Sequence, residues 1–418
     1  MTKNIILDNI NNPEVLEASY QSSPSEFIGD FKQALETHNE SETLKVWHAR
    51  LNYGNSTTNP RTNPRTNMPI GILIVLCLIA GFIAKLPTFF HIDDNWYFPR
   101  FIPLAVIGTV IFYFLNMMNS QKIRKVVAGG LLACTVYAVL LPNNTSSASI
   151  AMALIHLPLL LLSLLAVSFM SDKWESVQSR LSFIKYIGEV GIYSVLILLG
   201  GMVLTGITLG LFSLINLSIE EWYVEYIVVL GLVSTPLVAT YLFDAIQKRQ
   251  SKFSIILSNV FSPLFLVTIL VYLIAAIYQG ESPYSNRAFL IIFNGLLVVI
   301  LAITIFSISG RERKNTTHIT DFINMALIGA TLMVNIVALS AIIFRWAEYG
   351  VTLNRVVVTG ANLLIFIHLA LLLKQYIKQV WYNADPLELE VTITKYLPVY
   401  SVWSVIVVVV LPIVFQYK

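Results

Sequence analysis

Residues 101–142 read FIPLAVIGTVIFYFLNMMNSQKIRKVVAGGLLACTVYAVLLP, and this stretch decides the fold. It holds two apolar runs, 101–118 and 126–142, joined by a short loop with Lys122, Arg124 and Lys125. A helix of about 20 apolar residues is long enough to cross the ~30 Å hydrocarbon core of a bilayer. The stretch therefore predicts two transmembrane helices connected by a basic loop.

The same alternation of apolar runs and polar loops continues to the end of the chain. Of the 418 residues, 56% are hydrophobic and only 12% are charged, whereas a soluble domain usually carries about 25% charged residues. The mean hydropathy of +0.71 agrees. We therefore predict an all-α, polytopic transmembrane bundle of about eleven spans, at residues 69–86, 101–118, 126–142, 150–170, 186–215, 222–243, 254–278, 288–308, 322–344, 356–373 and 397–415.

Basic residues are distributed unevenly between the two sets of alternate loops. With Arg61 and Arg65, one set holds 17 lysines and arginines, and the opposite set holds six. Loops rich in lysine and arginine stay in the cytoplasm. The charge pattern thus predicts a multi-pass protein of the cytoplasmic (inner) membrane with its N-terminus in the cytoplasm and its C-terminus outside.

A short polar segment precedes the first apolar run. Residues 1–53 contain helix-start signals, each followed by an amphipathic stripe. In Asn12-Pro13-Glu14 we expect the Asn12 side chain to cap a helix whose first residue is proline, and Ser23-Pro24-Ser25-Glu26 has the spacing of a capping box. We predict a small cytosolic helical cap over residues 1–53, a linker over 54–67 and a transmembrane domain over 68–418. Such short helices bury little surface alone, so we expect the cap to dock on the membrane domain or on a protein partner.

The run at 186–215 is longer than one span requires. We expect it to be kinked at its glycine pair or to end in a partly re-entrant piece. Small residues on a transmembrane helix allow close approach of a neighbouring helix. Close packing is therefore predicted along this span at Gly200, Gly201, Gly206 and Gly210.

Several short stretches carry a family resemblance. They are Gly81 to Pro87, Gly200-Gly201 with Leu209 to Phe212, Phe261 to Leu266, Tyr349-Gly350-Val351-Thr352-Leu353-Asn354-Arg355, and the closing segment from Tyr396-Leu397-Pro398 through Pro412. Over most of residues 69–415, the chain resembles a bacterial group of polytopic membrane proteins catalogued as a domain of unknown function. The resemblance implies a bacterial cytoplasmic-membrane location and carries no activity.

Three ionisable residues within spans are candidate functional residues, because such groups are costly in a bilayer. His156 and His368 lie at different depths, so we expect each to have a structural or hydrogen-bonding role and not to share a metal. Glu189 lies near the inner end of its span. It either forms an interfacial ion pair or meets His368 inside the bundle as a proton-linked pair.

The predicted outer segment 345–355 is the second candidate region. It contains two arginines, an acid and several hydrogen-bond donors, with Gly350 permitting a tight turn. The arginines could hold an anion or a lipid headgroup. Alternatively, the segment is an ordinary turn whose charges pair with Asp93, Asp94 or Glu220 to Glu225. Its candidate residues are Arg345, Tyr349, Asn354 and Arg355.

No catalytic, metal-binding or cofactor-binding motif is present in the sequence, and no cofactor is expected. The expected partners are membrane lipids and a protein partner at the N-terminal segment, without nucleic acid. Two functions stay open. The chain is either a non-catalytic assembly, sensing or regulatory component of the membrane, or a transporter or channel for a small solute or lipid.

Overall fold

The structure is a computed structural model. It describes residues 5–10, 12–37, 41–52, 68–144, 146–214, 217–246, 253–279, 287–310, 319–382 and 384–417. The chain divides into two compact units, Met1–Thr66 and Asn67–Lys418. The predicted linker at 54–67 lies outside the described residues.

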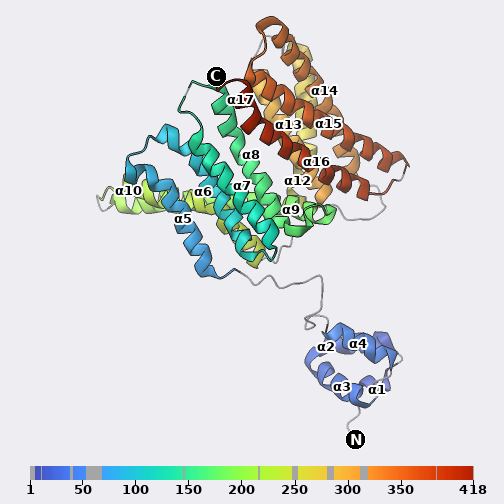
Figure 1. Ribbon diagram of the computed structural model, residues 1–418. Coiled ribbons are helices and arrows are strands. Elements are labelled where there is room, and N and C mark those ends of the chain that lie inside the picture. The colour runs from blue at the N-terminus through green and yellow to red at the C-terminus, as the bar shows by residue number, and fades with distance from the viewer. Residues whose placement is uncertain are drawn as a thin grey trace. The chain divides into compact units, whose positions relative to one another are not determined.

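The N-terminal unit consists of short helices around a small core (Figure 1). Proline at the first helical position starts two of them, where a missing N–H costs nothing. Asn12 occupies the N-cap position of one helix but makes no side-chain cap bond, so that part of the prediction was wrong. The helices are α1 (Ile5–Asp8), α2 (Pro13–Ser22), α3 (Pro24–Thr37) and α4 (Glu42–Asn52).

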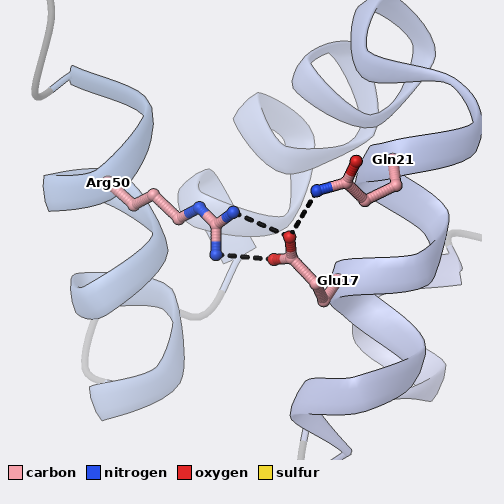
Figure 2. A network of polar contacts seen from close by, with 3 residues as sticks. All are labelled: Glu17, Gln21 and Arg50. Atoms are coloured by element: carbon pink, nitrogen blue, oxygen red, sulfur yellow. Dashed lines mark hydrogen bonds and ion pairs between the residues drawn. The ribbon is translucent and has the colours of Figure 1, made fainter. Parts of the chain in front are cut away.

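A polar network on the surface of this unit joins α2 to α4. Arg50 donates to Oε1 of Glu17 at 2.8 Å and forms an ion pair with Oε2 at 2.5 Å, and Gln21 donates to Oε1 at 2.9 Å (Figure 2). The hydrogen bonds from Gln21 and Arg50 lower the pKa of Glu17. Beneath this network, the apolar stripes meet in a core of Ile6, Leu16, Phe27, Phe31, Ala34, Leu44 and Trp47.

The second unit is a bundle of long apolar helices, and its described residues include no strand. Its principal helices are α5 (Ile70–Phe90), α6 (Asp94–Met117), α7 (Gln121–Leu140), α8 (Ala148–Met170), α9 (Val177–Leu214), α11 (Val229–Tyr241), α12 (Phe253–Gln279), α13 (Arg287–Ser309), α14 (Ile319–Tyr349), α15 (Leu353–Tyr382) and α16 (Leu387–Val405). Short elements complete it: η1 (Ser171–Lys173), α10 (Glu220–Trp222), η2 (Tyr223–Val228), η3 (Leu242–Ile246), η4 (Ile406–Val410) and α17 (Leu411–Val414).

The number of membrane-crossing helices agrees with the predicted fold. Ten helices of the described part are long and apolar enough to span a bilayer. The remaining predicted run, 254–278, forms α12, a helix of 27 residues. Its apolar part, Val260–Ile274, is shorter than those of the ten other helices. The chain is therefore an all-α, multi-pass integral membrane protein.

The bundle has two packed halves that meet at α8 and α9. One core cluster joins residues of α5 to α8 and α11, and two others join residues of α12 to α16 (Figure 1). Leu181 and Ile184 of α9 belong to the second half, whereas Tyr186 and Val190 belong to the first. A further cluster packs Ala148 and Met152 of α8 against α15 and η4. The N-terminal parts of α8 and α9 are thus in contact with both halves.

The C-terminal part of α9 differs from its prediction in two respects. Val177–Leu214 is one continuous helix of 38 residues, so it does not end in a re-entrant piece, and the expected kink at its glycine pair stays a prediction. The expected close packing is also absent, because no described residue lies within 4 Å of a Cβ added at Gly200, Gly201, Gly206 or Gly210. All the buried residues of α9 lie between Leu181 and Val190.

Candidate functional site

A cavity of about 350 Å³ opens where α14 turns into α15, next to the first turns of α13. It gathers three of the residues predicted from the sequence, Arg345, Asn354 and Arg355. We call this cavity the arginine pocket. Its remaining described lining residues are Ile291, Asn294, Ile342, Thr352 and Val358.

The turn that forms the pocket depends on a glycine and an arginine. Gly350 ends α14 with φ of +75°, a left-handed conformation that a side chain would strain. Arg355 then donates from one amino nitrogen to the carbonyl oxygens of Tyr349 and Gly350, at 3.0 Å and 2.5 Å. Its guanidinium carbon lies 5.7 Å from the centre of the Tyr349 ring. Arg355 thus caps the last carbonyls of α14 while it lines the pocket. The Tyr349 ring lies against the Arg355 guanidinium group and is not among the described lining residues.

The pocket brings two arginines together. Two guanidinium groups line it, and none of its described lining residues is acidic. The ion pairs among the described residues are Arg50 with Glu17 and Lys85 with Glu225, so Glu225 is committed elsewhere and not to this segment. Guanidinium groups bind phosphate and carboxylate groups through two parallel hydrogen bonds. The chemistry of the pocket therefore suits an anionic group.

Asparagines extend the polar lining of the pocket into the bundle. Asn362 of α15 donates to the Asn294 side chain at 2.8 Å, and Asn335 of α14 donates to the Asn362 carbonyl at 3.3 Å. Asn335 and Asn362 are both buried. These bonds join α13, α14 and α15, as expected for polar side chains between transmembrane helices.

His368 lies at another place, in the contact between α15 and α16. It is fully buried, its Nδ1 is 2.9 Å from the Tyr400 hydroxyl, and its ring stacks on Tyr396 with 4.3 Å between the ring centres. Tyr396 in turn donates to the Leu364 carbonyl at 2.9 Å. These contacts give His368 the hydrogen-bonding role that the sequence suggested.

Glu189 and His156 occupy separate positions. Glu189 is fully buried on α9. The described hydrogen bond of His368 goes to Tyr400 and not to Glu189, so a Glu189–His368 pair stays a prediction. His156 donates from Nδ1 to the Met152 carbonyl, one turn earlier in α8, at 2.9 Å.

Some residues of these sites were not identified from the sequence. Tyr396 and Tyr400 are four positions apart and share a helical face, which is the signal that could have indicated them. Asn294 comes from another helix, and nothing in the sequence showed that it lines a pocket with residues more than 50 positions away. Among the described residues, no group of three or more His, Cys, Asp or Glu side chains could hold a metal ion.

No protein family, no curated protein and no solved structure gives a significant match to this chain.

Proposed function

We propose that this integral membrane protein is a non-catalytic component of the bacterial cytoplasmic membrane that binds the anionic headgroup of a lipid in the arginine pocket. In this role it would act as an assembly, sensing or regulatory component of the membrane that responds to that lipid. The observation that carries the proposal is the pair Arg345 and Arg355 lining one cavity together with the polar side chains of Asn294, Thr352 and Asn354.

The surroundings of the pocket favour a lipid over a free anion. Ile291 and Val358 line it beside the polar groups, and Ile291 is 63% exposed. Ile343 and Phe344, which lie between Ile342 and Arg345 in the sequence of α14, are also exposed. A headgroup at the arginines would leave its acyl chains against these apolar side chains, where a free phosphate gains nothing.

The proposal is tested by lipid retention of the full-length protein purified in detergent. Native mass spectrometry would count bound phosphatidylglycerol in the unaltered protein and in Arg345→Gln and Arg355→Gln. We expect each change to lower retention at least tenfold, because a hydrogen bond to a charged group contributes roughly 1.5–3 kcal/mol. An excess of inorganic phosphate would displace a free anion but not a lipid held also by its chains.

Lys374→Gln is the matched control, since Lys374 is an exposed basic residue of the same helix that does not line the pocket. Thermal unfolding without added lipid would separate loss of binding from loss of fold, which matters for Arg355 because it also caps α14. Equal retention by Arg345→Gln and Lys374→Gln would rule out the arginine pocket as the lipid site.

The hydrogen-bonded asparagines Asn294, Asn362 and Asn335 support a second candidate function, a transporter or channel for a small solute or lipid. Its polar groups lead from the pocket to Asn335, whose Oδ1 is buried without a hydrogen bond from a described residue. In proteoliposomes, Asn335→Leu would then abolish flux of a fluorescent lipid while phosphatidylglycerol retention stays unchanged. Flux equal to that of protein-free vesicles would exclude this function.

The orientation and the cap complete the proposal. We place the N-terminus in the cytoplasm, with a protein partner on the N-terminal unit, which exposes Val46 and Ile28. Reporter fusions after Lys125 and Lys185 should then be cytoplasmic, and a fusion after Asn144 should be external. Two fusions on the wrong side would overturn this topology.

A further inference from the structure

The first turns of α6 contain a buried arginine without a counter-ion. Arg100 is 3% exposed, and it donates to the Trp96 carbonyl at 2.9 Å and to the Pro142 carbonyl at 3.0 Å. Its guanidinium carbon lies 5.1 Å from the centre of the Trp96 ring. It forms no ion pair with a described carboxylate. A buried charge is costly unless an opposite charge compensates it, so a bound anion beside Arg100 would be stabilising.

A cavity of about 840 Å³ lies beside Arg100, between the first turns of α6 and α8. Apart from Arg100, its polar residues lie at or before the helix starts, and its apolar residues lie in the turns that follow. Its polar lining residues are Asp93, Asn95, Arg100, Asn143, Asn144 and Ser147. Its apolar lining residues are Phe98, Pro99, Ile102, Pro103, Ile150, Ala151, Leu154 and Ile155. This separation matches an amphiphile, whose head and chains need different walls.

The polar rim is fixed by helix starts. Asp93 caps α6 by accepting a hydrogen bond from the Asn95 N–H at 3.2 Å, and Ser147 caps α8 by accepting one from the Ile150 N–H at 3.2 Å. Asn144 accepts from the Ser146 N–H and hydroxyl, at 3.2 Å and 2.7 Å. The carboxylate of Asp93 is exposed at this rim and has no ion pair with a described residue.

The cavity therefore presents a positive and a negative group. Arg100 and Asp93 both line it, and they lie seven positions apart at the start of α6. In an ethanolamine headgroup, two carbons separate the phosphate from the ammonium, so this headgroup also carries one group of each sign.

We propose that this cavity binds a phospholipid whose headgroup carries a primary amine next to the phosphate. The phosphate lies toward Arg100, and the ammonium donates to Asp93 and to the side-chain oxygen of Asn144. An acyl chain follows the apolar lining residues of α6 and α8. A lipid with an anionic headgroup and no amine would instead bring its negative charge toward Asp93. A choline headgroup has no N–H to donate to Asp93, so it would bind less tightly. This site is separate from the arginine pocket and does not depend on it.

The test measures lipid selectivity of the full-length protein in detergent. Phosphatidylethanolamine, phosphatidylcholine and phosphatidylglycerol with identical acyl chains would be offered together, and retained lipid counted by native mass spectrometry. We expect the unaltered protein to prefer the ethanolamine lipid to the choline lipid. Asp93→Asn keeps a side chain that can cap α6. It should lower the preference for the ethanolamine lipid about fivefold, which is the upper end of what a part-exposed ion pair contributes to binding.

Asp94→Asn is the matched control, because Asp94 is the neighbouring acid of the first turn of α6 and does not line the cavity. It should leave the preference unchanged, and Asp93→Asn should leave phosphatidylglycerol retention at the arginine pocket unchanged. Equal retention of ethanolamine and choline lipids by the unaltered protein would overturn the proposal. So would an equal loss in Asp93→Asn and Asp94→Asn.

Discussion

In the contact between α15 and α16, side chains fill the space around a glycine, whereas along the C-terminal half of α9 four glycines have no described neighbour. A Cβ added at Gly360 would lie 2.0 Å from Cη2 of Trp403. A Cβ added at Gly200 or Gly201 would meet nothing within 4 Å. Both regions are apolar helices with small residues, so composition alone does not distinguish a helix–helix contact from a surface covered by lipid.

The largest effect is expected at Gly360. In Gly360→Ala the new methyl would overlap the Trp403 indole, and relieving such overpacking costs about 1–3 kcal/mol. We therefore expect a clear fall in the thermal unfolding midpoint of the detergent-solubilised protein. Combining the change with Trp403→Phe, whose smaller ring leaves space, should recover part of the loss. A midpoint unchanged in Gly360→Ala would mean that α15 and α16 are farther apart than described.

A smaller effect is expected at His368 in the same contact. His368→Leu removes the hydrogen bond to the Tyr400 hydroxyl, a change worth roughly 0.5–1.5 kcal/mol. The double change with Tyr400→Phe should cost less than the sum of the two single changes, since both remove one bond. Strictly additive unfolding energies would show that the two side chains do not interact.

The predicted Glu189–His368 pair is tested in the same series. If the two side chains form a buried pair, adding Glu189→Gln to His368→Leu recovers part of the lost stability, because no uncompensated partner stays behind. Because His368 forms its described hydrogen bond with Tyr400, we expect the stability losses of Glu189→Gln and His368→Leu to add in the double variant. Partial recovery in this double variant would instead establish the pair.

The smallest effect is expected in the C-terminal half of α9. Gly201→Ala adds a methyl where no described residue lies within 4 Å, so stability should change by no more than about 0.5 kcal/mol. A loss comparable to that of Gly360→Ala would show that a second molecule packs on this face in solution. The two glycine variants are therefore each other's control.

Several features of the fold could be predicted from the sequence because they depend on local properties. Apolar runs such as 101–118 mark helices by length alone, and Pro13 and Pro24 mark the starts of α2 and α3. The order of polar and apolar residues does not say which helix faces meet. The glycines of α9 were consequently expected to pack closely, while Gly360 was not noticed.

The candidate site was predictable to a similar extent. Arg345, Asn354 and Arg355 lie within eleven residues of one turn, so their proximity followed from the sequence. Asn294 comes from another helix, and the cavity beside Arg100 requires α6 and α8 to lie together. Contacts between distant segments depend on tertiary packing, which a single sequence does not reveal.

The length of α9 has a consequence for the choice of membrane. Its 38 residues extend about 57 Å, nearly twice the ~30 Å of a typical hydrocarbon core, whereas the 20 residues of α7 extend about 30 Å. A bilayer that matches α7 forces α9 to tilt steeply or to project into the headgroup region. Thicker bilayers relieve this mismatch for α9 and create one for α7, so acyl-chain length acts on the angle between these two helices.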